Sequence, residues 1–410
     1  MIHIKYIITI GLLVITSVSY AQSLNDYIEV ALKNNPEIQS FELKHQIAEE
    51  KTNESVTLAN TEFGAGYFVS EPETRTGPQR FKLSVKQMLP WFGTITAREN
   101  YSSSLADASY TEITIAKRKL MLTVTESYYK LYALQAKQEV LKEQIDLLKH
   151  YEQIALTGVE VGKTSAVKVL QLQIRENELD EKRRVFEQEY LGELVAFNLL
   201  LNQDKENNVA VISALEIPTQ TEEIEIEIDN LQLHPELLKY DALYNSVTQA
   251  ELLNQKSNGP NLGIGLDYIN VSERTDMDVL DNGKDIFMPM VSISVPIFNK
   301  SIRSKTLQNK LQQEEIEMQK ALKINQLTTY LEIASKNRTN ARISYETQQK
   351  NMEQAVNAEE ILIKNYETET INFNDLLDIL ELQLNIQLNE IEAIKNYYLQ
   401  SALINYITNN

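Results

Sequence analysis

Four short segments that alternate apolar and polar residues interrupt a chain otherwise made of long helix-forming stretches: 61–70, 79–88, 261–271 and 286–295. Because successive side chains of a strand point to opposite faces, the alternation predicts four β-strands with one apolar face each. A soluble sheet and a membrane barrel with lipid outside and water inside both fit this pattern. Four strands are too few to close a barrel, and lipid does not tolerate open strand edges. Strands that cross a membrane would therefore need several copies of the chain.

The second segment shows how the two faces are expected to differ. Phe81, Leu83 and Val85 share one side, and Lys82 lies on the other. On the membrane interpretation, an arginine at Leu83 or Ile264 would face lipid and be destabilising. Replacement of Lys82 by alanine is expected to be mild.

The first 21 residues have the pattern of a secretory signal. Lys5 precedes the apolar run Ile7–Ile15, and small residues around Ala21 fit a cleavage site. The apolar run is too short to span a bilayer. The sequence therefore predicts cleavage after Ala21 and an exported mature chain.

Composition removes several classes of function. The chain has no cysteine, which excludes disulfides and thiolate metal sites, and its net charge of −19 argues against a nucleic-acid partner. His45, His150 and His234 are far apart and lack the spacing of metal ligands. No phosphate-binding loop or nucleophile motif is present. We expect no enzyme activity, no cofactor and no metal centre.

Two stretches are predicted to form very long helices. No proline lies between Trp91 and Ile217, and neither proline nor glycine follows Ile297. The helical arms 94–156 and 299–365 would each extend about 95–100 Å. In the last stretch, apolar residues recur at coiled-coil spacing, with a second stripe beside them, which is typical of a helix in a closed ring. The alternating run from 380 to 388 also fits a strand, but the lack of turn residues favours a helix.

The chain repeats one plan at an offset of about 200 residues. The motif Asn35–Ile38 returns as His234–Leu237, and Leu89–Phe92 returns as Val295–Phe298. Each copy contains a helix, two strands, a long helix, a tight turn and a returning helix.

The predicted domains follow these copies. The first repeat covers 22–202, with its helical hairpin at 94–200, and the second covers 234–410, with its hairpin at 299–408. The acidic segment 203–233 is predicted to be an equatorial connector attached to the side of the helical body.

This plan resembles the TolC family of outer-membrane efflux channels over nearly all of the mature chain. The similar motifs are the Asn-Pro-Glu start, the strand end Val295–Phe298, the turn Val161–Thr164 and the run Asp375–Asp378. The resemblance implies a mainly α fold with a small β part. Long antiparallel coiled-coil hairpins would form an α-barrel, and a homotrimer would complete a twelve-stranded β-barrel in the outer membrane. Segments 73–79 and 87–93 are similar to the branch that serves heavy-metal pumps.

The resemblance also implies a function and its sites. The protein would be the exit duct of a tripartite efflux system, extending into the periplasm and working with a periplasmic adaptor and an inner-membrane pump of the RND type. Asp375 and Asp378, one helical turn apart, would form the acidic pore constriction. The tips expected to dock the adaptor carry Val161, Gly162, Thr164, Glu369 and Asn372.

Some features depart from the family pattern. The first copy has Lys168 and Gln171 where the second has the two aspartates, so any acidic ring comes from the second copy alone. Glu369 replaces the glycine of the first turn, and no cysteine is available for a lipid anchor. Two alternatives remain open: a periplasmic coiled-coil scaffold, and the export duct of a type I protein secretion system. A scaffold would have no use for strands with an apolar outer face.

Overall fold

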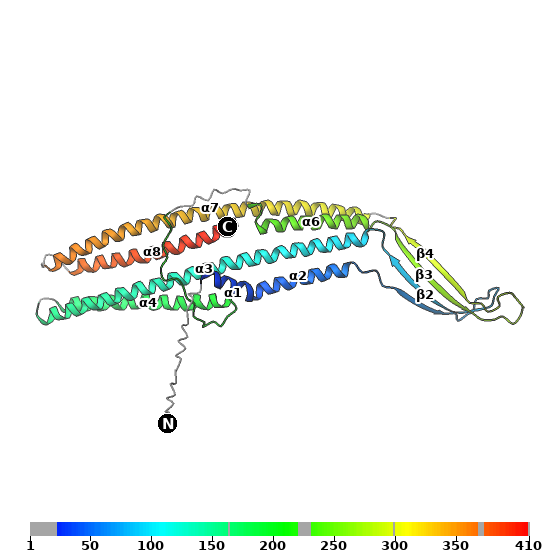
Figure 1. The fold of residues 1–410 in the computed structure, drawn as a ribbon, viewed down its shortest axis with the longest axis horizontal. Coiled ribbons are helices and arrows are strands. Elements are labelled where there is room, and N and C mark those ends of the chain that lie inside the picture. The colour runs from blue at the N-terminus through cyan, green and yellow to red at the C-terminus, as the bar shows by residue number, and fades with distance from the viewer. Residues whose placement is uncertain (1–22, 163–164, 220–230, 298–299, 368–372, 409–410) are drawn as a thin grey trace, which may run out of the picture. The chain divides into compact units, whose positions relative to one another are not determined.

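The computed structural model describes residues 23–162, 165–219, 231–297, 300–367 and 373–408, so the predicted signal lies outside the described residues. The fold is mostly helical with one small antiparallel sheet, which confirms the predicted combination. Figure 1 labels the helices α1 (Leu24–Asn34), α2 (Pro36–Ser55), α3 (Thr94–Glu160), α4 (Ala166–Leu200), α6 (Pro235–Lys256), α7 (Lys300–Glu367) and α8 (Phe373–Thr408). The strands are β1 (Glu62–Tyr67), β2 (Gln79–Leu89), β3 (Asn261–Val271) and β4 (Ile286–Ser294).

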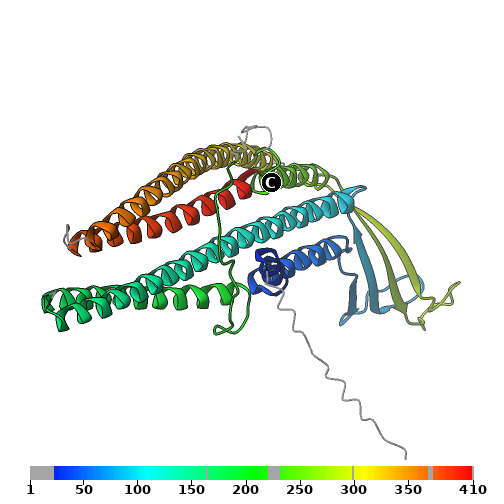
Figure 2. The ribbon, with the colours of Figure 1, turned by 60° about the vertical axis from the view of Figure 1, so that its left-hand side comes forward.

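The chain divides into two compact units that do not coincide with the sequence repeats. Unit 1 comprises Met1–Ala31, Val124–Pro218 and Arg342–Lys395, and unit 2 comprises Leu32–Thr123, Thr219–Ala341 and Asn396–Asn410. Figures 1 and 2 show α3 and α7 as unbroken helices, and they are 67 and 68 residues long. Because each contributes to both units, each unit draws on both repeats.

The repeated Pro-Glu motif starts a helix in each copy. Proline occupies the first turn of α2 and of α6, where its missing N–H costs nothing. In the first copy, the backbone N–H of Glu37 donates to Asn35 Oδ1 at 2.9 Å. In the second copy, the N–H of Glu236 donates to His234 Nδ1 at 3.3 Å. The N-cap at equivalent positions of the two repeats is therefore an amide oxygen in Asn35 and an imidazole nitrogen in His234.

The core of unit 1 is a coiled-coil cluster of α3, α4 and α8. Leu141, Leu172, Leu380 and Leu384 are almost fully buried in it. Burial of each such leucine contributes about 1.5–3 kcal/mol. Leu382, between the buried Leu380 and Leu384, is 50% exposed, and the whole run is helical. A strand would have put all three leucines on one face. Helical periodicity therefore prevails over the local alternation.

The sheet belongs to unit 2 and has the order β1-β2-β3-β4 with every pair antiparallel. β1 and β4 are its edges and are paired on one side only. The register places Leu83 opposite Tyr268, and Ile264 opposite Val291. Paired residues share a face, so Leu83 and Ile264 fall on one side of the sheet with Val291. Lys82 and Asp267 fall on the other side, together with apolar residues such as Ile269.

Candidate membrane and tip surfaces

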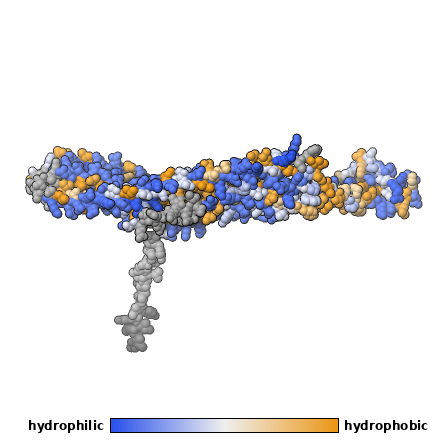
Figure 3. Space-filling model, turned by 90° about the horizontal axis from the view of Figure 1, so that it is seen from above, coloured by the Kyte–Doolittle hydropathy of each residue, from blue (hydrophilic) through white to orange (hydrophobic). Residues whose placement is uncertain are grey.

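The apolar face of the sheet is exposed. Phe63, Leu83, Ile264 and Val291 share this face through the strand register, and their exposed fractions are 82%, 47%, 49% and 76%. Figure 3 shows hydrophobic surface, in orange, over the end of the chain that carries the strands. A sheet of a soluble protein normally turns its apolar face to a core. This sheet does the opposite within a single chain.

The polar face is the sheltered one. Asp267 on β3 is fully buried and forms an ion pair with Lys82 on β2. Glu62 and Lys86 lie opposite each other in the β1–β2 register. Loss of Lys82 would leave a buried carboxylate without its cation, which typically costs about 3–5 kcal/mol. Lys82→Ala is therefore not the mild change that the alternation predicts, and Lys86 is the better control position.

The two hairpin loops brace each other at the far end of the sheet. An Arg274 guanidinium nitrogen donates to the carbonyl of Thr74 at 3.2 Å, and the N–H of Ser272 donates to the carbonyl of Pro78 at 2.8 Å. Gly77 has φ +125°, and a Cβ on it would lie 1.8 Å from the Ser272 carbonyl oxygen. Glycine is therefore required there for the two loops to meet.

The hairpin tip of unit 1 is a tight turn with an exposed apolar surface. Gly162 follows α3 with φ +73°, in the left-handed conformation that ends helices. Ser165 then caps α4 by accepting the N–H of Val167 at 3.2 Å. Val161 and Val167 are exposed on either side of this turn. The other predicted tip residues, Thr164, Glu369 and Asn372, lie outside the described residues.

The two predicted pore aspartates stand in the first turns of α8. Asp375 and Asp378 are both exposed, whereas Leu376 and Leu380 are buried in the core of unit 1. The leucines fix the rotation of α8, because they must face α3 and α4. This rotation leaves both carboxylates on the outside of the single chain.

An arginine that sequence reasoning did not single out lies beside these aspartates. Arg175 on α4 pairs with Glu381 on α8 at 2.8 Å and with Glu178 at 2.9 Å. Arg175, Asp378 and Gln171 line one cavity of about 360 Å³. The sequence shows only the local Arg175–Glu178 spacing. The link to α8 joins residues far apart in the chain and requires the tertiary fold.

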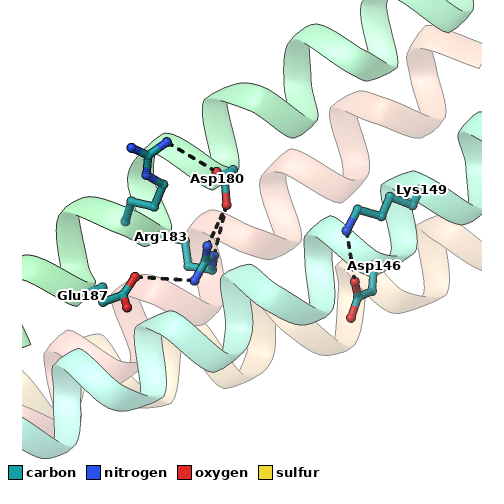
Figure 4. A network of polar contacts seen from close by, with 6 residues as sticks. Asp146, Lys149, Asp180, Arg183 and Glu187 are labelled. Atoms are coloured by element: carbon teal, nitrogen blue, oxygen red, sulfur yellow. Dashed lines mark hydrogen bonds and ion pairs between the residues drawn. The ribbon is translucent and has the colours of Figure 1, made fainter.

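A charged network covers the exposed side of the same hairpin (Figure 4). Arg183 pairs with Asp180 and Glu187 along α4, and Lys149 pairs with Asp146 on α3. The hydrogen bond from Arg183 holds the pKa of the Asp180 carboxyl below its ordinary value. Exposed pairs of this kind are individually worth little. They identify a solvated surface of the hairpin.

Three tyrosine hydroxyls hold the described part of the connector against α1 and α3. Each accepts a backbone N–H: Tyr27 from Ala210 at 2.9 Å, Tyr128 from Ile212 at 3.0 Å and Tyr132 from Leu215 at 3.3 Å. The rings of Tyr27 and Tyr128 also contact Phe197. The sequence predicts helix packing for Tyr128 and Tyr132 and contains no signal for the role of the three hydroxyls.

The described residues, 23–408 with their gaps, contain no further candidate site of two kinds. No helix among them has an apolar stretch long enough to cross a bilayer. Within the same residues, no group of three or more His, Asp or Glu side chains is placed to hold a metal ion.

The fold is that of outer-membrane channel proteins. The outer-membrane channel OprN matches with a TM-score of 0.73 and 16% identity, over 94% of this chain and 89% of that chain. CusC, whose structures describe transmembrane channel formation, matches with a TM-score of 0.74 and 13% identity, over 94% of this chain and 91% of that chain. The outer membrane protein VceC of Vibrio cholerae matches with a TM-score of 0.71 and 15% identity, over 94% of this chain and 95% of that chain. No sequence family and no curated protein matches the chain.

Proposed function

We propose that the protein is the outer-membrane exit duct of a tripartite efflux system. Three copies would close a barrel in the outer membrane, and their helices would form a tunnel into the periplasm. Cargo, a small molecule or a metal cation, would arrive from an inner-membrane pump of the RND type through a periplasmic adaptor. Transport through the duct would be passive.

The sheet is the observation that carries the proposal. It exposes its apolar face, shelters its charged face and leaves β1 and β4 with open edges. Lipid on the outside, water on the inside and a second copy at each edge satisfy all three features. The periplasmic scaffold explains none of them. A type I secretion duct would share them, so the choice between the two ducts depends on the pump.

The helices next to the edge strands support a contact between copies. α2 leads into β1, and α7 follows β4, so pairing of β1 with β4 of the next copy brings α2 beside that copy's α7. The end of α2 carries Glu49, Glu50 and Glu54 with one lysine, Lys51, among them. The start of α7 carries Lys300, Arg303 and Lys305. Acidic residues at the C-terminal end of α2 and basic residues at the N-terminal end of α7 are each unfavourable to the dipole of their own helix. The opposite charges would be satisfied across the seam between copies.

The trimer is tested by mass and by cross-linking. The detergent-extracted complex is expected to have the mass of three mature chains. Since the chain has no cysteine, Glu54→Cys combined with Arg303→Cys introduces the only thiols. A short bifunctional maleimide should then give bands of two and three chains, and each single variant should give no three-chain band. A water-soluble monomer would refute the proposal.

The tip is tested by a charge on its apolar surface. We expect Val161→Asp to abolish efflux while the trimer and its membrane insertion remain intact, because Val161 is exposed at the turn and contributes little to folding. Substitution of Gly162 would be less informative, because its positive φ makes any side chain strained. Val185→Asp is the control, because Val185 is likewise exposed but lies along α4, away from the turn. Normal efflux in Val161→Asp would exclude docking at this tip.

A further inference from the structure

His234 joins the start of α6 to the end of α8 in unit 2. Its side chain is 1% exposed. Nδ1 accepts the N–H of Glu236 at 3.3 Å, and Nε2 lies 3.2 Å from the carbonyl oxygen of Tyr406. The rings of His234 and Tyr406 also pack edge to face, with centroids 5.4 Å apart.

Only one form of the imidazole makes both hydrogen bonds. The contact with Glu236 needs an unprotonated Nδ1, and the contact with the Tyr406 carbonyl needs a proton on Nε2. The neutral ring with its proton on Nε2 meets both conditions. A second proton, on Nδ1, would point at the N–H of Glu236 and remove the cap of α6.

The groups around the ring do not favour a charged imidazole. Arg118 of α3 donates to the same Tyr406 carbonyl, and Lys323 of α7 lies 2.8 Å from Glu236. Glu236, the one carboxylate facing the ring among the groups just described, also accepts the Tyr406 hydroxyl at 2.6 Å. Burial, opposed by Glu236 and reinforced by Arg118 and Lys323, lowers the pKa of His234 from its ordinary 6.5.

The first repeat supplies a natural comparison. Asn35 occupies the position equivalent to His234 and caps α2 through its side-chain oxygen. Asparagine does not titrate, so the first cap is independent of pH. The histidine makes the second cap conditional on pH.

We propose that His234 is an acid-released latch: a proton taken up from solvent at Nδ1 breaks the cap of α6, while Nε2–H keeps its contact with the Tyr406 carbonyl of α8. Around the latch lies an apolar cluster that includes Leu237, Leu331 and Ile404. These side chains hold the closed form, and opening would expose them. The latch acts on the helical body and does not depend on the transport proposal.

Hydrogen exchange of the full-length protein in detergent tests the latch. Below pH 6.5 the open form takes up a proton that the closed form resists. Protection of the amides at 236–238, corrected for the intrinsic rate, should therefore fall about tenfold per pH unit. His234→Asn should keep the cap and show no such loss. An equal loss in both proteins, or no loss in the wild type, would overturn the proposal.

A measurement on the wild type covers the case in which His234→Asn does not fold. The imidazole signals can be followed by NMR from pH 8 to pH 4 and assigned with His45→Gln and His150→Gln. His234 should remain neutral at pH values below its ordinary pKa of 6.5. Titration of His234 at or above its ordinary value would refute the latch, whatever the outcome of the transport experiments.

Discussion

Leu83→Arg is expected to abolish assembly in the outer membrane. Leu83 lies on the exposed apolar face of β2, opposite Ala65 and Tyr268 in the register. On the proposed function this position faces lipid, where an arginine costs about 2–4 kcal/mol near the midplane. Three copies would carry the change, so the cost would be incurred three times per complex. Ile264→Arg, on the same face of β3, should have the same effect.

The measurement is the yield of heat-modifiable trimer in the outer-membrane fraction. Lys86→Ala is the matched control, because it changes the charge of the same strand on the opposite face. It should assemble normally, whereas Lys82→Ala should be impaired through the buried Asp267. If Leu83→Arg and Lys86→Ala assemble equally well, then either the faces of the sheet or its membrane location are assigned incorrectly.

Asp375→Asn combined with Asp378→Asn is expected to weaken the cation preference of the channel strongly. In the proposed trimer the pair would contribute six carboxylates to a narrow ring, and acidic rings select cations in pores. Both side chains are exposed in the single chain, while Leu376 holds the helix in its core. The double change should therefore leave folding nearly untouched, within about 0.5 kcal/mol.

Conductance in planar bilayers measures this effect through the reversal potential in a salt gradient and through block by multivalent cations. The control is Asp146→Asn with Asp180→Asn, which removes the same number of charges from the solvated surface of the hairpin. The control should keep both selectivity and block. Unchanged selectivity and block in the Asp375/Asp378 variant would place the constriction elsewhere.

The sequence predicted those parts of the fold that depend on local periodicity. The alternation of Phe81, Leu83 and Val85 identifies the apolar face, and the leucine spacing in α8 identifies its buried side. Both patterns hold because burial acts on every side chain of an element in the same way. The exposed aspartates of α8 follow from the same periodicity once the leucines are placed.

Contacts between distant side chains could not be predicted in this way. Arg175 and Glu381 are brought together by packing of α4 on α8, and His234 meets Tyr406 across 172 residues. Lys82 reads as an ordinary charge on a polar face, and its importance becomes visible only with the buried Asp267. Single polar contacts leave no repeating pattern, so one sequence does not reveal them.

The tyrosine hydroxyls that hold the connector have a consequence for its tolerance to change. Tyr128 and Tyr132 bind main-chain amides at Ile212 and Leu215, and they do not depend on which side chains those residues carry. The two tyrosines are one turn of α3 apart, so the spacing of the connector's anchored amides has to match the spacing of that turn. Substitutions along the connector would preserve its path. A one-residue insertion between Ile212 and Leu215 would move one amide away from its tyrosine hydroxyl. The connector between residues 212 and 215 should therefore tolerate changes of residue type but not changes of length.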